Sequence, residues 1–385
     1  MKAYQESWLK NRYALRLAKQ FQQDGHLTSD QLEAIQQSHT DLPYSPNIFI
    51  KLLLFIFGLI GFSFGGAFFA IFLVGDTKWG IPITYFVYGI ITLVVLIQLI
   101  KNRKLYNAGI DNALIYCILG SLIPLFFKIS EINNFKEPWV LGLLFLPFLA
   151  SITYAFGEPV VALGLLFDLM FIFSSLLIKH PIGKTFLPFI LLGLLMLLYL
   201  VVRKFSEKKS AFYWQLALSW VSPVILILGY ASINYMVVRY ANASLNNLPL
   251  PAPEIRFSWL FWGLTFLIPL LQLWLGIRWR DRMMLVVAFL CSISSIFTYR
   301  HYHSVLPTEW GLILGGAILG LGAYFLYNYL KQPKGGFSVT PEESTHTLLH
   351  SFVLSQLTKS NQAITPQELK MGGGDFGGGG AGENY

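Results

Sequence analysis

The stretch LLLFIFGLIGFSFGGAFFAIFLV, residues 52–74, contains no charged side chain. The hydrocarbon layer of a bilayer is about 30 Å thick, and an apolar α-helix of about 20 residues spans it. A helix of this length on a soluble protein would need polar side chains along its solvent-facing side. The stretch therefore predicts a membrane-spanning helix.

Similar apolar blocks recur along the chain. Of its 385 residues, 55% are hydrophobic and only 12% are charged, which is typical of a membrane protein. Strands of a membrane barrel would alternate apolar and polar residues over about ten positions, whereas these blocks are continuously apolar. The sequence predicts an all-α integral membrane helical bundle with ten transmembrane helices, at 52–74, 81–100, 110–127, 139–156, 160–178, 186–202, 212–234, 259–277, 283–299 and 310–330.

Basic residues indicate the orientation of these spans. They form clusters within 101–104, 203–209, 278–282 and 331–334, all on the side shared with the N-terminus. On the other side they are scattered among acidic residues. Because loops rich in Lys and Arg stay in the cytoplasm, we predict that both termini are cytoplasmic. The net charge of +8 then reflects topology, and a nucleic-acid partner is not expected.

The join between the fourth and fifth predicted spans decides the orientation of everything after it. Gly157, Glu158 and Pro159 leave room only for a tight turn there. Merging the two spans into one would invert the rest of the chain and put three of the basic clusters outside. We therefore predict two separate helices.

The polar N-terminal region, residues 1–47, predicts a cytoplasmic pair of helices. The first would run from 3 to 24 and end at Gly25, since glycine commonly takes the left-handed conformation that stops a helix. The second would start at Thr28, which forms a capping box with Gln31. This pair precedes the predicted membrane bundle, residues 48–331.

Two further regions follow the bundle. Residues 332–371 contain helix-start signals at Thr340 and Thr365, each followed by proline, and predict cytoplasmic helices. Residues 372–385 read GGGDFGGGGAGENY and are mostly glycine. Such a segment buries too little apolar surface to fold alone, so a disordered tail is expected.

The order of these regions resembles known families. The polar helical pair LAKQFQQDGHLTSDQLEAI (17–35), followed by a bundle opening with GLIGFSFGGAFFAIFLV (58–74), is similar to the bacterial membrane proteins described as domain of unknown function 2157 and its relative 4401. The resemblance implies a multi-pass protein of the bacterial inner membrane, and it assigns no functional residue.

Asp168 is the leading candidate for a functional residue. It lies near the middle of the fifth predicted span, where a carboxyl is costly unless it is neutralised, paired or hydrated. It can serve as a proton- or cation-linked site, or as a structural group hydrogen-bonded to a neighbouring helix. Glu158 precedes it by about 15 Å of helix and is turned away from it, so the two do not predict a carboxylate dyad. Glu158 is expected at the membrane interface.

A second candidate group lies between the last two predicted spans. His301, His303 and Glu309 occur together in RHYHSVLPTEW, and imidazole and carboxylate groups ligate transition metals. Their spacing matches no specific zinc signature. Ordinary residues of an interfacial aromatic belt are the preferred interpretation, and no cofactor is predicted.

Small residues predict close helix packing. Glycines at i and i+4 let two membrane helices approach each other, and the partner helix can belong to this chain or to another protomer. Prolines inside spans, at Pro147, Pro223 and Pro269, each remove one helical hydrogen bond. The predicted packing glycines are Gly61, Gly65, Gly311, Gly315, Gly316 and Gly320.

These observations leave alternative functions open. The first hypothesis is a membrane scaffold or sensor whose cytoplasmic ends engage a protein partner, because both ends carry capped helices and the spans are poor in polar residues. The alternative is a secondary transporter or channel that uses Asp168 and the proline-containing helices. A membrane-embedded enzyme ranks third, since the motifs of the common enzyme classes are missing from the sequence. The expected partners are the lipid bilayer, a membrane or cytoplasmic protein, or a second copy of the chain.

Overall fold

The computed structural model describes residues 2–23, 25–73, 78–135 and 137–303, and isolated positions between 313 and 328. It divides into two compact units. One comprises Met1–Arg12 with Asp41–Gly315, and the other comprises Tyr13–Thr40 with Gly316–Tyr385. Most of the tenth predicted span, Gly311, Gly315, Glu309 and everything predicted for 332–385 lie outside the described residues.

The described residues are all-α and form no β-strand. Their helices are α1 (Glu6–Gln23), α2 (Ser29–Ser38), α3 (Ile48–Leu73), α4 (Gly80–Arg103), α5 (Ile110–Ser121), α6 (Ile123–Ile132), α7 (Pro138–Phe156), α8 (Pro159–Ile178), α9 (Pro181–Ser206), the 3₁₀ helix η1 (Lys209–Trp214), α10 (Gln215–Ile233), α11 (Tyr235–Leu245), α12 (Ser258–Trp279) and α13 (Arg282–Tyr302).

Nine of the described helical segments are long and apolar enough to cross a membrane. They agree with the first nine predicted spans. The third combines α5 and α6, which meet at Leu122 just before Pro124, and the seventh combines η1 and α10. Pro147, Pro223 and Pro269 lie inside α7, α10 and α12 as predicted. The chain is thus a polytopic membrane protein of helical-bundle type.

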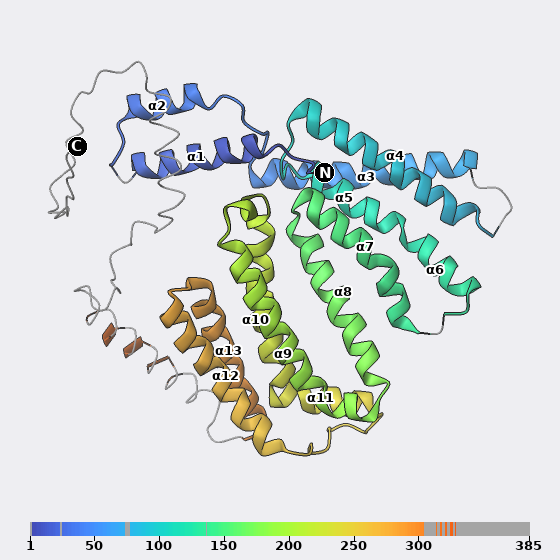
Figure 1. Ribbon diagram of the computed structural model, residues 1–385, viewed down its shortest axis with the longest axis vertical. Helices are drawn as coiled ribbons and strands as arrows, with labels where there is room; N and C mark the ends of the chain where they lie inside the picture. The colour runs from blue at the N-terminus through green and yellow to red at the C-terminus, as the bar shows by residue number, and fades with distance from the viewer. Residues whose placement is uncertain are drawn as a thin grey trace, which may run out of the picture. The chain divides into compact units, whose positions relative to one another are not determined.

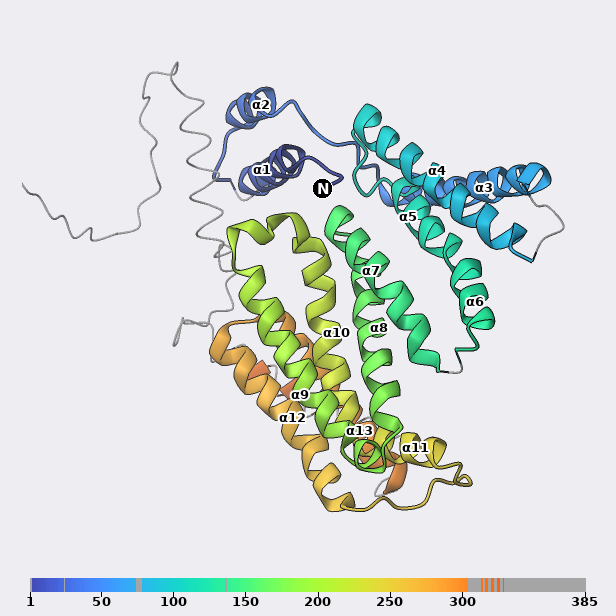
Figure 2. The same ribbon diagram turned by 45° about the vertical axis from the view of Figure 1, so that its right-hand side comes forward.

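Neighbouring spans in the sequence pack as antiparallel pairs. Figures 1 and 2 both show α7 beside α8, α9 beside α10, and α12 beside α13. The turn between α7 and α8 is as tight as predicted: Gly157 has a left-handed φ of 60°, Glu158 is the N-cap of α8, and Pro159 is its first residue. The two spans are therefore separate.

The helical pair of residues 13–40 has its own small core. Leu15, Ala18, Leu32 and Ile35 are buried against one another. The predicted capping box is confirmed, since Thr28 and Gln31 bond to each other's backbone N–H groups. Gly25 takes the expected positive φ, 78°.

Helix α11 was not anticipated. Its residues fall in a predicted outer loop, because the helix is only partly apolar and too short to span. Asn234 separates it from α10 and is almost fully buried. The Asn234 side chain accepts hydrogen bonds from the N–H groups of Met236 and Val237, and it donates to the Tyr230 hydroxyl at 2.7 Å. One asparagine thus ends one helix and starts the next.

The two predicted packing glycines of α3 differ. A Cβ on Gly65 would overlap the Tyr88 hydroxyl of α4, so glycine is required for this close approach. A Cβ on Gly61 would meet no atom within 4 Å, so Gly61 does not support packing among the described residues. Gly61 instead borders a shallow surface hollow with Phe57 and Val95. Gly316 and Gly320, in the second unit, are likewise open.

Candidate functional site

Asp168 lies in α8 and faces α7. A Cβ on Gly142 of α7 would come 2.9 Å from Asp168 Oδ1 and 2.8 Å from Ile172, so the glycine makes room for the carboxyl. The other oxygen, Oδ2, is buried and has no hydrogen-bond partner among the described residues. The side chain therefore packs against a neighbouring helix with one unsatisfied oxygen.

Glu158 lies at the end of its helix, as expected, but it is buried, with only 6% of its surface exposed. Its Oε2 accepts from the N–H of Val161, at 2.8 Å, and caps α8. Its Oε1 accepts from the Tyr116 hydroxyl at 2.6 Å and from Asn112 Nδ2 at 3.3 Å, both on α5. Glu158 thus joins α5 to α8, whereas Asp168 contacts α7.

The two histidines contact aromatic rings. His301 lies beside Tyr240, with Nε2 3.4 Å from the hydroxyl, and His303 lies against Trp262 and Tyr299. The described residues contain no group of three His, Cys, Asp or Glu side chains placed to hold a metal ion. Glu309 is not among them. The interfacial aromatic belt stays a prediction, with which these ring contacts are compatible.

Asp111 is a functional candidate that the sequence did not single out. Its carboxyl side chain is fully buried in the first turn of α5. Its Oδ1 accepts from the N–H groups of Ala108 and Gly109, at 2.8 and 3.0 Å, and its Oδ2 accepts from the Tyr4 hydroxyl at 2.9 Å. Every contact is a hydrogen bond to a carboxyl oxygen, which is how a buried acid is stabilised.

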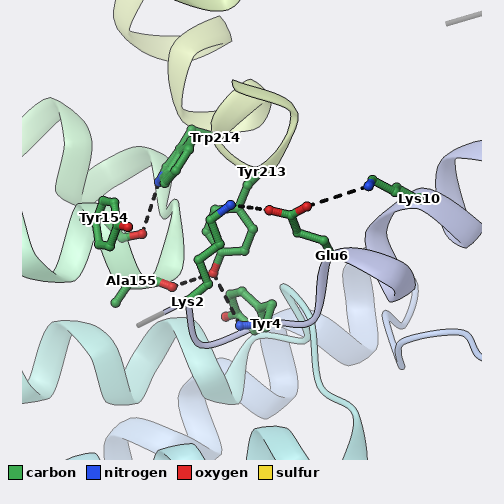
Figure 3. A network of polar contacts seen from close by, with 8 residues as sticks. All are labelled: Lys2, Tyr4, Glu6, Lys10, Tyr154, Ala155, Tyr213 and Trp214. Atoms are coloured by element: carbon green, nitrogen blue, oxygen red, sulfur yellow. Dashed lines mark hydrogen bonds and ion pairs between the residues drawn. The ribbon is translucent and has the colours of Figure 1, made fainter. Parts of the chain in front are cut away.

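Tyr4 comes from the segment just before α1 and inserts among the ends of the spans. Figure 3 shows its neighbours in this network. Its N–H donates to the Tyr213 hydroxyl at 3.3 Å, and that hydroxyl donates to the carbonyl of Ala155. The preceding Ala3 N–H donates to the same carbonyl at 2.8 Å. We call Ala3, Tyr4, Asp111, Ala155 and Tyr213 the N-terminal anchor.

The ring of Tyr4 also packs against neighbouring aromatic rings. It makes edge-to-face contacts with Tyr106 and Phe156, at centroid distances of 5.1 and 6.1 Å. Burial, reinforced by the neighbouring Asp111 carboxyl, raises the pKa of Tyr4 well above its ordinary range. The hydroxyl therefore remains protonated and donates at neutral pH.

Charged groups cover the outer side of the anchor (Figure 3). Lys2 pairs with Glu6, and its ammonium lies 4.6 Å from the ring centroid of Trp214. The hydrogen bond from Lys2 lowers the pKa of Glu6. Trp214 in turn donates to the carbonyl of Tyr154 at 3.1 Å. The segment before α1 is thus fixed to α5, α7 and η1.

These contacts also explain where the compact units divide. Sequence alone suggested a boundary at residue 47, between the polar N-terminal region and the bundle. Residues 2–12 instead belong to the unit of the spans, because Tyr4, Trp8 and Leu9 are buried in the same core as α4 and α5. The one available signal was the pair Tyr4 and Trp8, one helical turn apart in an otherwise polar segment.

No family model, curated protein or solved structure matches this chain. The function of the N-terminal anchor is therefore argued from its geometry. The anchor joins an amphipathic helix to three spans through buried hydrogen bonds, and neither a metal cluster nor a catalytic pair accompanies it among the described residues.

Proposed function

We propose that this protein is a sensor or scaffold of the bacterial inner membrane, in which α1 is coupled to the state of the spans. The observation that carries the proposal is the N-terminal anchor. Tyr4 contacts α5 through Asp111 and the seventh span through Tyr213, and Ala3 contacts α7 through Ala155.

The coupling follows from what the contacts would lose. The spans containing Asp111, Ala155 and Tyr213 all accept hydrogen bonds from the two-residue segment Ala3–Tyr4, so a change in their spacing breaks at least one of these bonds. Each such loss costs about 1–3 kcal/mol. A shift of that size changes the ratio of attached to released α1 by about 5- to 150-fold. The binding of a partner to α1 would then depend on the spacing of the spans.

We place the anchor on the cytoplasmic side. The basic residues at the ends of α4 and α9 flank the same end of the spans as Tyr4, and such clusters are retained in the cytoplasm. The polar helical pair of 13–40 and the region after 331 would then be available to a cytoplasmic protein or to a second copy of the chain.

Hydrogen exchange of residues 6–12 in bilayers of two thicknesses tests this coupling. Bilayers that mismatch the spans by several ångströms are expected to change the exchange rate of these amides about fivefold. In Tyr4→Phe, which keeps the ring but removes the donor to Asp111, the rate should rise about tenfold in both bilayers.

The control is Asp41→Asn, which alters an exposed ion pair with Lys104 outside the anchor and should behave as the wild type. If exchange in the spans responds to thickness while residues 6–12 stay constant, α1 is not coupled and the proposed function is wrong.

A second candidate, a transporter or channel, is favoured by one observation: Asp168 keeps a buried carboxyl oxygen without a partner in the middle of a span. If Asp168 carries protons, Asp168→Asn should fold normally and abolish proton flux in proteoliposomes. If it is structural, Asp168→Asn and the similarly shaped Asp168→Leu should change stability by less than about 1 kcal/mol, because no hydrogen bond is lost. Wild-type vesicles without flux above empty vesicles would remove this candidate.

A further inference from the structure

Basic residues at the ends of α9 and α12 lack acidic partners. Six of them are exposed, and within the described part of the chain they make no ion pair or side-chain hydrogen bond. They belong to two stretches, one in and just after the last turn of α9 and one around the turn from α12 to α13. These residues are Lys204, Lys208, Lys209, Arg278, Arg280 and Arg282.

The two stretches lie together in space. The hydroxyl of Tyr199, on α9, donates to Asp281 Oδ2 at 2.9 Å and lies 3.8 Å from the sulfur of Met284. One turn further along α9, the guanidinium of Arg203 lies 3.9 Å from the ring centroid of Trp279. These contacts bring the end of α9 next to the turn between α12 and α13, and both stretches carry basic residues.

The guanidinium of Arg203 is held in position by Trp279, but its ion pair is weak. Stacking on an indole fixes the plane of a guanidinium. The Nη1 atom of Arg203 is buried and has no hydrogen-bond partner among the described residues. Its ion pair with Glu207 is long, 3.6 Å, and the Glu207 side chain is 67% exposed, so it contributes little. Asp281 is occupied by Tyr199 and by the N–H of Met284.

The opposite ends of the spans differ. There, Lys184 donates to the carbonyl of Leu245, Arg239 donates to the carbonyl of Ala252, and Lys179 pairs with Glu137 at 2.7 Å. These cations are satisfied by the chain itself. The basic residues near Arg203 are therefore open to an anion from outside the chain.

The surface next to the cluster indicates which anion. Two apolar side chains are exposed here, Val201 on α9 (56%) and Ile277 on α12 (50%). Both lie within one helical turn of the basic residues. Apolar side chains exposed on membrane spans contact acyl chains. An anion with attached acyl chains would satisfy both surfaces at once, whereas a soluble anion would satisfy only the first.

We propose that an anionic phospholipid binds at the junction of α9 with the turn between α12 and α13. Its phosphate accepts hydrogen bonds from Arg203, which Trp279 holds in place, and the surrounding Lys and Arg residues attract the headgroup. Its acyl chains lie along the exposed apolar side chains of α9 and α12.

Lipid-dependent thermal stability of the full chain in detergent tests the proposal. Phosphatidylglycerol should raise the melting temperature, and phosphatidylcholine should not. Arg203→Gln should weaken the apparent affinity for phosphatidylglycerol about tenfold, and Arg203→Lys, which keeps the charge but loses the planar fork, should fall between. The matched control is Arg103→Gln, because Arg103 also lies in the last turn of a span but, unlike the part-buried Arg203, is exposed. This substitution should change the affinity less than about twofold.

Three results would overturn the proposal: equal stabilisation by the two lipids, equal weakening in Arg203→Gln and Arg103→Gln, or full stabilisation by inorganic phosphate alone. Should Arg203→Gln fail to fold, the same comparison applies to Arg278→Gln against Arg103→Gln. Retention of phosphatidylglycerol by the wild type in native mass spectrometry, reduced in Arg278→Gln but not in Arg103→Gln, would then support the site, and equal retention would contradict it.

Discussion

Replacement of Asp111 by alanine is expected to lower the free energy of unfolding in detergent by about 3–5 kcal/mol. Asp111 is fully buried and accepts hydrogen bonds from Ala108, Gly109 and Tyr4. Alanine would leave all three donors buried without an acceptor. Chemical or thermal unfolding monitored by circular dichroism measures the loss.

The variant Asp111→Asn keeps the shape of the side chain and replaces the carboxyl with an amide. The amide oxygen can still accept from Ala108 and Gly109, and the amide nitrogen can donate to the Tyr4 hydroxyl, so the loss should be only about 1–2 kcal/mol. Asp41→Ala is the control, because Asp41 makes an exposed ion pair with Lys104 and should matter by less than about 1 kcal/mol. An Asp111→Ala protein as stable as the control would show that the anchor contributes nothing to the fold.

The spans could be predicted because a segment that crosses the lipid must be apolar and must satisfy its own backbone hydrogen bonds. Most residues of a span face lipid or another span, so a long uncharged stretch such as 52–74 forms a membrane-spanning helix. The tight turn at Gly157 was predictable for the same reason, since a single longer helix would have placed basic clusters on the wrong side. The capping box at Thr28 could also be predicted, because its contacts join residues only three positions apart.

The anchor could not be predicted, because its contacts are distant in sequence. Tyr4 meets Asp111 and Tyr213, which are 107 and 209 residues away. Asp111 follows Gly109 at the edge of an apolar block, where a solvated carboxylate is the ordinary expectation. Asp168 attracted attention through its position in a span, yet the structure gives it a glycine as neighbour and no hydrogen bond. Hydropathy finds spans; it does not find which polar groups meet at their ends.

Replacement of Gly109 by alanine is the second change expected to lower the stability strongly. Gly109 has a φ of 102°, which L residues rarely adopt, and a Cβ there would overlap the backbone oxygen of Lys51 and lie 2.9 Å from its carbonyl carbon and 3.1 Å from the nitrogen of Phe55. The atoms in the way belong to the backbone of α3, so they cannot turn aside as a side chain could. Gly109→Ala should therefore cost about 2–5 kcal/mol, the sum of the left-handed conformation and overpacking.

Gly25→Ala supplies the matched control for Gly109→Ala. Gly25 also has a positive φ, 78°, but a Cβ there would meet no atom within 4 Å. Its substitution should cost only the conformational part, about 1–2 kcal/mol. The difference between the two variants in the free energy of unfolding measures the close approach of the 104–109 loop to α3. Because Gly109 N–H also donates to Asp111, the same substitution should raise the exchange rate of residues 6–12, whereas Gly25→Ala should leave it unchanged. Equal losses of stability in both variants would mean that α3 does not pack against this loop, and that the anchor lacks the rigid support on which its coupling depends.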